Sequence, residues 1–245
     1  MSPPVVPRYR TALATDRAEV QACQRLRAEV FRRGWRARLP FRRASGALDV
    51  DEWDELCDHV LVRDGFTGAV VATCRLLPPE RAAALGRGHG DDGFDLTGHA
   101  AFRPDLVEAG RACLHPGHGA GPVVAALWSG VAGAVQQGGH RFLGGRVSIP
   151  LADGGATAAG VWDAVSARHL APAALRVAPR VPFDVAGPAR PVRLAMPPLL
   201  RSCLRIGAHV CGPPAHDAGL GTADLYVLLR MVDVPPRVRR LSATA

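Results

Sequence analysis

Apolar and polar residues alternate along this chain with two different periods, and these periods predict an ordered series of helices and strands. Apolar residues recur at helical spacing between positions 20 and 30, which indicates an amphipathic helix over residues 19–33. Two short apolar runs, 59–63 and 69–77, are joined by a turn that contains Gly65 and Gly68, the pattern of a β-hairpin. Three more strands (106–114, 141–149 and 225–231) and three more helices (122–137, 156–170 and 198–208) are predicted downstream.

This order of elements predicts an α/β fold of the α+β type, with an antiparallel hairpin early and a strand–turn–helix–strand unit in the middle. Residues 78–104 are rich in Gly, His and Asp and are expected to form an irregular excursion, while residues 176–191 are expected to form a loop or edge strand. A chain of 245 residues is long enough to bury one large core. We therefore expect a single domain over residues 8–232, with flexible tails at 1–7 and 236–245.

The charge balance is basic, with a formal net charge of +8 and a sequence pI of about 10.1. All 30 basic residues are arginine, so no lysine is available as a nucleophile or for a Schiff base. Basic proteins favour acidic partners such as nucleic acid, an anionic membrane or an acidic carrier protein. Because only 5% of the residues are aromatic and no helix-turn-helix pattern is present, nucleic acid is the least favoured of these.

Much of the positive charge falls on the first predicted helix and the segment after it. The arginines concerned are Arg25, Arg27, Arg32, Arg33, Arg36, Arg38, Arg42 and Arg43. Such a basic face is either simply solvated or docks an acidic partner, and the sequence favours neither alternative.

Cysteine spacing and hydropathy bear on the compartment. The six cysteines are dispersed, without metal-ligand spacing, and the first ten residues lack the apolar core of a signal peptide. These features favour reduced thiols in a cytoplasmic protein without a bound metal. The apolar run 120–135 contains Pro122 and Ser129 and is shorter than the roughly 20 residues of a membrane-spanning helix, so we expect a buried core helix. Contact with an anionic membrane surface stays open.

Ionisable residues beside predicted buried strands are the strongest sign of function. Asp51 and Asp54 precede the hairpin, Arg75 lies inside its second strand, and Glu108 and Arg111 lie inside strand 106–114. Burying such groups is costly unless they are paired or take part in chemistry. The arginines are expected to pair with Glu108 or the two aspartates, and the residues alone do not decide between a structural ion-pair network and a catalytic site.

The turn from Pro116 to Gly121 leads into the helix at 122–137, and its glycines let backbone N–H groups approach a ligand such as a phosphate. Glycine-rich turns before helices are common, so this motif is weak by itself. Histidines 89, 99, 118 and 140 lie in glycine-rich turns and are expected to be exposed to solvent. The sequence contains no nucleophile-elbow serine, zinc signature or Walker loop.

Several of these motifs follow one another in an order that resembles one branch of the GNAT-fold acyltransferases. The motifs are Arg27-Ala28-Glu29-Val30-Phe31, Trp35, Asp51-Glu52-Trp53-Asp54, Arg75-Leu76-Leu77 and Glu108-Ala109-Gly110-Arg111. This branch includes N-acyl-amino-acid synthases, the ornithine-lipid (hemolysin-like) N-acyltransferases and, in part, acyl-homoserine-lactone synthases. Residues 57–62, 110–116, 127–128 and 197–208 are similar to the ornithine-lipid group in particular. The resemblance covers residues 9–232 and implies a GNAT-like mixed, largely antiparallel central sheet flanked by helices.

The resemblance implies transfer of a fatty acyl group, such as a 3-hydroxyacyl group, from an acyl carrier protein thioester to the α-amine of ornithine or a similar amino acid. The amine attacks the thioester directly, so neither a covalent enzyme intermediate nor a bound cofactor or metal is implied. By the same resemblance, Glu108 would accept the amine proton, directly or through a water, and Asp51 and Asp54 would hold the cationic substrate. Arg75 and Arg111 would orient those carboxylates or the carboxylate of the substrate, and Arg111 is counted with the catalytic group. A lipid product implies a position in the cytoplasm, at the inner face of the membrane.

The resemblance also assigns binding roles. Substrate binding falls to Arg75, Arg27, Phe31, Trp35, Asp58 and His59. Binding of the donor phosphopantetheine arm falls to Cys113, Leu114, Gly117, Gly119 and Gly121, with backbone N–H groups along 112–114 stabilising the oxyanion. The chain departs from the family pattern in the turn 117–121, which has no arginine, so acyl carrier protein and acyl-CoA both stay open as donors.

Two alternatives remain open. The first is an autoinducer-type synthase that uses S-adenosylmethionine, against which the Cys57-Asp58-His59 run and the longer C-terminal part argue. The second is a non-catalytic GNAT-like module that binds a carrier protein or an anionic surface. A pure binding module has no need of Glu108, which argues against this second alternative.

Overall fold

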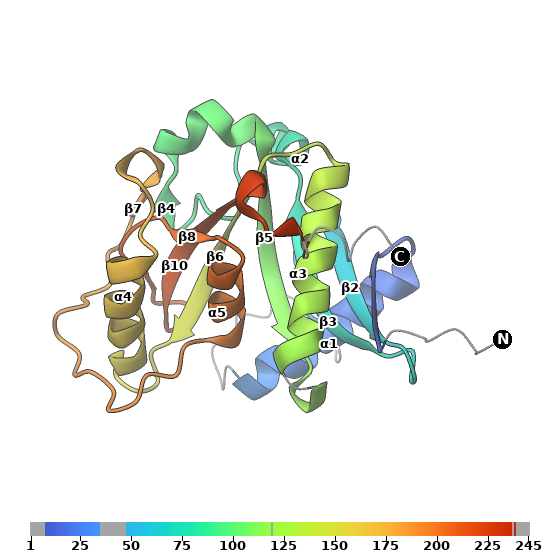
Figure 1. The fold of residues 1–245 in the computed structure, drawn as a ribbon, viewed down its shortest axis with the longest axis horizontal. Coiled ribbons are helices and arrows are strands. Elements are labelled where there is room, and N and C mark those ends of the chain that lie inside the picture. Colours follow the sequence, from blue (N-terminus) through green and yellow to red (C-terminus); the bar gives the residue numbers. More distant parts are fainter. Residues whose placement is uncertain (1–7, 35–47, 119, 237, 239–245) are drawn as a thin grey trace.

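A central β-sheet with helices on both faces forms the body of the protein (Figure 1). The computed structural model describes residues 8–34, 48–118, 120–236 and 238. The helices are α1 (Arg17–Gly34), α2 (Pro79–Leu85), α3 (Ala120–Gln137), α4 (Ala156–Arg168) and α5 (Pro198–Arg205). Helix α3 lies in front of the sheet against β1, β2, β3 and β5, while α1 lies behind it against β3 and β5 (Figure 1).

The strands of the large sheet run in the order β1-β2-β3-β5-β6-β10-β8, and β9 also pairs with β10. Their bounds are β1 Tyr9–Leu13, β2 Asp58–Asp64, β3 Val70–Leu77, β5 Leu106–Leu114, β6 Phe142–Pro150, β8 His209–Val210, β9 Ala215–Asp217 and β10 Thr222–Arg230. A separate pair joins β4 (Phe94–Asp95) to β7 (Ala178–Pro179). Among these ladders, only the β5–β6 pair is parallel.

Strands β5 and β6 separate part-way along their length. Their ladder joins residues 106–109 to residues 142–145, although β5 continues to Leu114 and β6 to Pro150. Beyond Ala109 the two strands diverge towards their C-terminal ends (Figure 1). Each keeps its other neighbour, β3 for β5 and β10 for β6. The divergence leaves the β6-facing edge of residues 110–114 without a partner in the β5–β6 ladder.

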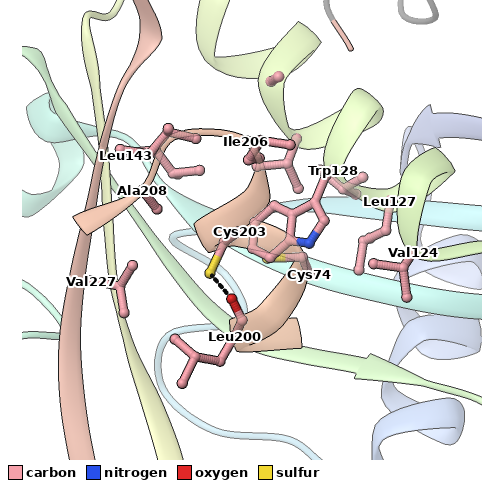
Figure 2. Close-up of a cluster of buried hydrophobic side chains, with 14 of the residues drawn as sticks. Cys74, Val124, Leu127, Trp128, Leu143, Leu200, Cys203, Ile206, Ala208 and Val227 are labelled. Atoms are coloured by element: carbon pink, nitrogen blue, oxygen red, sulfur yellow. Dashed lines mark hydrogen bonds between the residues drawn. The ribbon is translucent and has the colours of Figure 1, made fainter. Parts of the chain in front are cut away.

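The main core fills the space between the sheet and helices α3 and α5. Leu127 and Trp128 of α3 meet Leu200 and Cys203 of α5 there, over sheet residues such as Val227 (Figure 2). The indole Nε1 of Trp128 donates a 2.6 Å hydrogen bond to Ser202 Oγ, which gives its one polar atom a partner. Leu127-Trp128 and the segment around Leu200 are both similar to the ornithine-lipid group in sequence. The structure places them together in the core, so their role is packing.

The secondary structure confirms most of the predicted elements. Strand β5 has the predicted bounds, α1, α3, β2, β3, β6 and β10 deviate by a few residues at most, and the mixed, largely antiparallel sheet flanked by helices is confirmed. The apolar run 120–135 belongs to helix α3, whose Val123, Leu127 and Val131 are buried in the core. None of the helices in the described residues has the length and hydropathy needed to cross a membrane.

Three parts of the secondary structure differ from the prediction. The stretch 78–104 is not simply irregular, because Pro79 begins α2 and residues 97–105 form 3-10 turns. Strand β1 was missed because it is an edge strand whose side chains are mostly exposed, so it has no strong apolar signal. Strands β8 and β9 were missed because they are only two and three residues long, and pairing with β10 defines them. The predicted tail 1–7 lies outside the described residues, as do residues 237 and 239–245 of the predicted tail 236–245. Within that second tail, the carbonyl of Val238 accepts a hydrogen bond from Ser129 Oγ.

Candidate active site

A buried network of arginine and aspartate side chains connects helix α1 to the loop before β2. The Arg27 side chain has no exposed surface, its Nε donates to Asp49 Oδ2 at 2.9 Å, and its Nη2 donates to Asp54 Oδ1 at 2.7 Å. The grouping of Arg27 with the surface arginines is therefore wrong. Because it lies on the sheet-facing side of α1, it is buried, whereas Arg25 and Arg32 of the same helix are exposed.

Two more arginines reach the same loop from the sheet. Arg75 Nη1 on β3 forms an ion pair with Asp51 Oδ1 and lies 3.3 Å from Asp54 Oδ1. Arg111 Nη2 on β5 donates to Asp51 Oδ2 at 3.1 Å. The expected pairing of these arginines with the two aspartates is confirmed. Glu108, the other expected partner, forms its hydrogen bond elsewhere.

Arg111 reaches the network because strand β5 bulges at this residue. The β3–β5 register shifts between Thr73 and Arg75, and Arg111 has a φ of 52°, in the left-handed region that residues other than glycine rarely adopt. This conformation costs about 1–3 kcal/mol and persists only where neighbouring contacts hold it. Asp51 and the ring of Phe31, whose centroid is 5.7 Å from the Arg111 guanidinium carbon, supply such contacts. Strained bulges of this kind cluster at functional sites.

The network keeps Asp51 ionised. Burial acts to raise the pKa of Asp51, but the hydrogen bonds and charges of Arg75 and Arg111 outweigh it and hold the pKa well below its ordinary value. The loop is also tied internally, since the Trp53 N–H donates to Asp51 Oδ1 and the Asp51 N–H donates to Asp54 Oδ2, each at 3.0 Å. Three arginines (27, 75, 111) face three aspartates (49, 51, 54), so the network adds no net charge to the site.

Glu108 is more deeply buried than Asp51 and lies near the end of the β5–β6 ladder, opposite Gly144. Its residue surface is 2% exposed, and Oε2 accepts a 2.6 Å hydrogen bond from the N–H of Gly90. Burial raises the pKa of this carboxyl group above its ordinary value. A buried carboxylate with a raised pKa, next to a site of mixed charge, is a candidate for proton transfer.

Tyr226 of β10 lies on the same face of the sheet as Glu108. Its hydroxyl is buried and has no hydrogen-bond partner in the part of the chain that the structure describes. Burial, with the charge of Glu108, raises the pKa of Tyr226 well above its ordinary value, so the phenol is neutral. Sequence analysis missed this residue because a tyrosine inside an apolar strand has the pattern of an ordinary core residue.

The expected solvent exposure of the histidines is wrong for His99 and His89. His99 has no exposed surface, and its Nε2 lies 2.9 Å from the Leu175 carbonyl. His89 is half-buried, with its ring centroid 4.3 Å from that of Trp53, and burial lowers its pKa to about 3. Both rings contact residues that are distant in sequence, Leu175 for His99 and Trp53 for His89. Such contacts leave no pattern in the sequence around each histidine.

The partly open side of the site carries three charged side chains. Asp51 is 25% exposed, Arg111 is 29% exposed and Arg146 of β6 is 27% exposed, whereas Asp54 and Glu108 are covered. Arg146 directly follows Gly145, the last β6 residue paired with β5. It was not predicted, because one arginine in a half-buried strand resembles an ordinary surface residue.

The other residues predicted to bind the acceptor substrate differ from one another in burial and in their contacts. Asp58 is half-exposed and forms a 2.9 Å ion pair with Arg81. His59 is buried, with Nε2 3.0 Å from the Asp54 carbonyl, and burial lowers its pKa, so it supports the acidic loop as a neutral ring. Phe31 is half-buried beside Arg111, and Trp35 lies outside the described residues.

The predicted donor residues lie along the separated part of β5 and the turn after it. Cys113 is 3% exposed, and Leu114 is half-buried against the core. Gly117 and Gly121 are exposed, although the Gly117 N–H already donates to His115 Nδ1 at 3.1 Å. Gly119 lies outside the described residues.

Comparison with known proteins identifies the class to which this fold and site belong. Residues 26–129 match the family model described as an acetyltransferase (GNAT) domain. The CoA-dependent acyl-homoserine lactone synthase BjaI, solved with SAM and isopentyl-CoA, superposes with a TM-score of 0.55 over 96% of this chain and 86% of that one, at 16% identity. The acyl-homoserine lactone synthase LasI gives a TM-score of 0.53 over 91% and 90% of the two chains, at 13% identity. The protein is thus an acyltransferase with the GNAT fold, as its motifs indicated.

Curated relatives define the family more narrowly. The L-ornithine N(alpha)-acyltransferase of Rhodobacter capsulatus is 33% identical over 90% of this chain and 89% of its own. Enzymes of the same name from Agrobacterium fabrum and Brucella abortus are each 28% identical, over 93% and 92% of this chain and 82% and 85% of their own. The chain belongs to the family of L-ornithine N(alpha)-acyltransferases.

Proposed function

We propose that this protein transfers a fatty acyl group from an acyl carrier protein thioester to the α-amine of ornithine or a closely similar amino acid. The observation that carries the proposal is Glu108, a buried carboxyl group with a raised pKa at the point where β5 and β6 begin to separate. Relatives named for ornithine Nα-acylation, which align over most of the chain, support ornithine as the acceptor.

The chemistry is direct aminolysis of a thioester. Glu108 accepts one proton from the α-ammonium group, directly or through a water, and the freed amine attacks the thioester carbon. The carbon–sulfur bond then breaks, and the sulfur leaves with a second proton from the nitrogen. The products are an amide and a free thiol, so no oxidant, metal or bound cofactor is needed for the balance.

An acyl-enzyme intermediate is not part of the proposal. A cysteine nucleophile works as its thiolate, and burial raises the pKa of Cys57 to about 11 and that of Cys74 to about 12. Burial also raises the pKa of Cys113, the cysteine nearest the proposed donor position. These buried thiols are poor nucleophiles, and the chain has no lysine that could attack in their place. In the proposed reaction the attacking group is therefore the amine of the substrate.

The separated edge of β5 is the proposed place for the thioester carbonyl. Residues 110–114 have no β6 partner in the ladder, so backbone N–H groups on that edge can donate to the developing oxyanion. One well-placed donor contributes about 3 kcal/mol to transition-state stabilisation. The phosphopantetheine arm would enter between the two strands and reach the turn at Gly117 and Gly121.

The arginine–aspartate network is proposed to prepare the acceptor site. Asp51 is the most exposed of its carboxylates and can attract the ammonium group on the substrate side chain. Arg75, Arg27 and Asp54 are too deeply buried for that contact, so they hold Asp51 and its loop in position. We also propose that the enzyme works in the cytoplasm against the inner face of the membrane, since its product would be a lipid.

The test is an assay of purified protein with 3-hydroxyacyl carrier protein and ornithine, following thiol release and product mass. The proposal expects an N-acylornithine product, lost in the Glu108→Gln variant. Acyl-CoA in place of the carrier thioester, and S-adenosylmethionine in place of ornithine, identify the donor and the acceptor. Absence of thiol release with every acceptor, in a protein that binds the carrier tightly, would overturn the proposal in favour of a non-catalytic module.

A further inference from the structure

Arg146 lies on the same face of the sheet as Glu108, within reach of the same substrate. Glu108 is opposite Gly144 in the parallel β5–β6 ladder, and Arg146 comes two residues later on β6. Alternate residues of a strand share one face, and two residues span about 6.6 Å. A Cβ on Gly144 would lie 2.5 Å from the Tyr226 hydroxyl and 3.1 Å from Leu106 Cδ1, which confirms that this face is the one that carries Glu108.

Among the described residues, the guanidinium of Arg146 has one long ion pair. Its Nη1 lies 3.5 Å from Asp224 Oδ2, and no hydrogen bond from its side chain to any other described residue is present. Asp224 itself is 1% exposed and accepts a 2.8 Å hydrogen bond from Thr222 Oγ1. A guanidinium has five N–H donors, so most of those on Arg146 remain available on its exposed side.

The other arginines of the site already form ion pairs with the aspartates of the network. Arg27 and Arg75 are buried and bind the aspartates of the network at 2.7 to 3.3 Å. Arg111 is partly exposed, but its Nη2 donates to Asp51 and its guanidinium lies over the ring of Phe31. The cation that an anionic group entering beside Glu108 can bind is therefore Arg146 on β6, whose guanidinium is held, within the described part of the chain, only by the 3.5 Å ion pair with Asp224.

We propose that Arg146 binds the α-carboxylate of the acceptor amino acid and thereby selects amino acids over simple amines. This inference rests on the proposed function. The α-amine and the α-carboxylate share one carbon atom, so a base for the amine and a cation for the carboxylate must lie side by side. Glu108 and Arg146 meet this requirement from neighbouring strands, and the bidentate geometry of a guanidinium matches a carboxylate.

The loop between α2 and β4 lies over both groups. A Cβ on Gly90 would approach Glu108 Oε2 to 3.3 Å, and a Cβ on Gly93 would lie 3.4 Å from Arg146 Nη1. The Gly93 carbonyl accepts a 2.9 Å hydrogen bond from the Arg180 N–H, which anchors the loop on its far side. One short loop thus lies close to both the proton acceptor and the proposed carboxylate-binding residue.

The experiment compares ornithine with 1,4-diaminobutane, which is ornithine without its carboxylate, as acceptors for the same acyl thioester. Wild type, Arg146→Gln, Arg146→Lys and a control, Arg141→Gln, are assayed for kcat and KM. Arg141 is 68% exposed and pairs with Asp105, so its replacement removes a β6-adjacent arginine and an ion pair outside the site. Ornithine binding to each protein is measured separately by calorimetry.

We expect Arg146→Gln to raise KM for ornithine about 10- to 100-fold, with weaker ornithine binding, and to leave the diaminobutane rate unchanged. Arg146→Lys should recover part of the ornithine affinity, and Arg141→Gln should match wild type. An unchanged ornithine KM in Arg146→Gln, or equal losses with both acceptors, would overturn the inference. If wild type instead acylates neither acceptor nor any other amino acid, the proposed function itself has failed.

Discussion

The backbone N–H of Gly90 donates a 2.6 Å hydrogen bond to Oε2 of Glu108, and this bond fixes the proposed base from a loop 18 residues away in sequence. The loop lies so close to the carboxyl group that a Cβ on Gly88 would overlap Glu108 Oε1. Two glycines are therefore required on steric grounds, Gly88 for space and Gly90 for the approach of its N–H. The position of Glu108 depends on this loop as much as on strand β5.

Gly88→Ala tests that dependence. The added methyl group has no room beside Oε1, so the carboxyl group must move away from its position at the N–H of Gly90. We expect acyl transfer to fall about 100-fold, because small displacements of a reacting group have effects of this size. The measurement is kcat/KM for ornithine, with circular dichroism to confirm that the fold is retained.

Gly98→Ala is the matched control, since the nearest atom to its new Cβ would be the Arg176 carbonyl at an ordinary 3.7 Å. This control should keep wild-type activity. Full activity in Gly88→Ala would show that the loop moves away from Glu108 during the reaction, and would contradict a fixed position for the base.

Glu108→Gln is expected to lose activity without losing stability. A general base contributes about 10²- to 10⁴-fold to a rate, and the amide cannot accept the ammonium proton. The pKa of Glu108 is raised by burial, so its ionisation costs folding free energy once the pH rises above the ordinary value of 4.5. The glutamine side chain of the variant avoids this cost and still offers an oxygen to the Gly90 N–H.

The sign of the pH dependence follows from the raised pKa. Below pH 4.5 the difference in free energy of unfolding between the two proteins should not change with pH, because Glu108 is then protonated in both the folded and the unfolded state. Above that pH the advantage of the variant should grow until the pH passes the folded-state pKa. Urea unfolding between pH 4 and 8 measures this difference. Greater stability of wild type at pH 8 would mean that Glu108 has an unrecognised cationic partner.

Arg27→Leu should destabilise the fold strongly. The change leaves Asp49 and Asp54 buried without their shared guanidinium, and breaking a buried ion pair from one side costs about 3–5 kcal/mol. For a chain of this size the expected decrease in Tm is about 10 °C. Thermal unfolding measures it, with Arg25→Gln on the exposed side of the same helix as a control of little effect. A Tm within a degree or two of wild type would show that the two aspartates find other partners.

The sequence predicted the members of this buried cluster better than the contacts among them. Asp51, Arg75, Glu108 and Arg111 were identified because charged residues beside apolar strand patterns are rare and costly. Their pairing was predicted only in part, since Glu108 bonds to Gly90 and not to an arginine. A backbone N–H donor and the glycines that make room for it leave no charge pattern in the sequence. The contact between Gly90 and Glu108 therefore could not be predicted from the sequence.

Long-range packing accounts for the other missed features. Asp49 partners Arg27 across 22 residues, and Arg146 reaches the site because β6 and β5 are parallel neighbours. Neither relationship has a local periodicity. The strands that were predicted are 7 to 9 residues long and carry their own apolar pattern, whereas β8 and β9 are defined by their pairing with β10.

A basic surface on helix α1 is the predicted contact for the acyl carrier protein. Arg25 and Arg32 are exposed on α1, on the outer side of the helix that carries Arg27 inward, and they give this surface positive charge. If an acidic carrier docks there, Arg25→Glu/Arg32→Glu should lower kcat/KM for the carrier thioester about tenfold through slower association, and added salt should reduce the difference. A short acyl-pantetheine thioester lacks the carrier, so its rate should be unchanged in the double variant. Arg201→Glu/Arg205→Glu makes the same change of charge at exposed positions of α5 and is the control. Equal losses in both double variants would point to net charge in general, and would argue against a docking surface on α1.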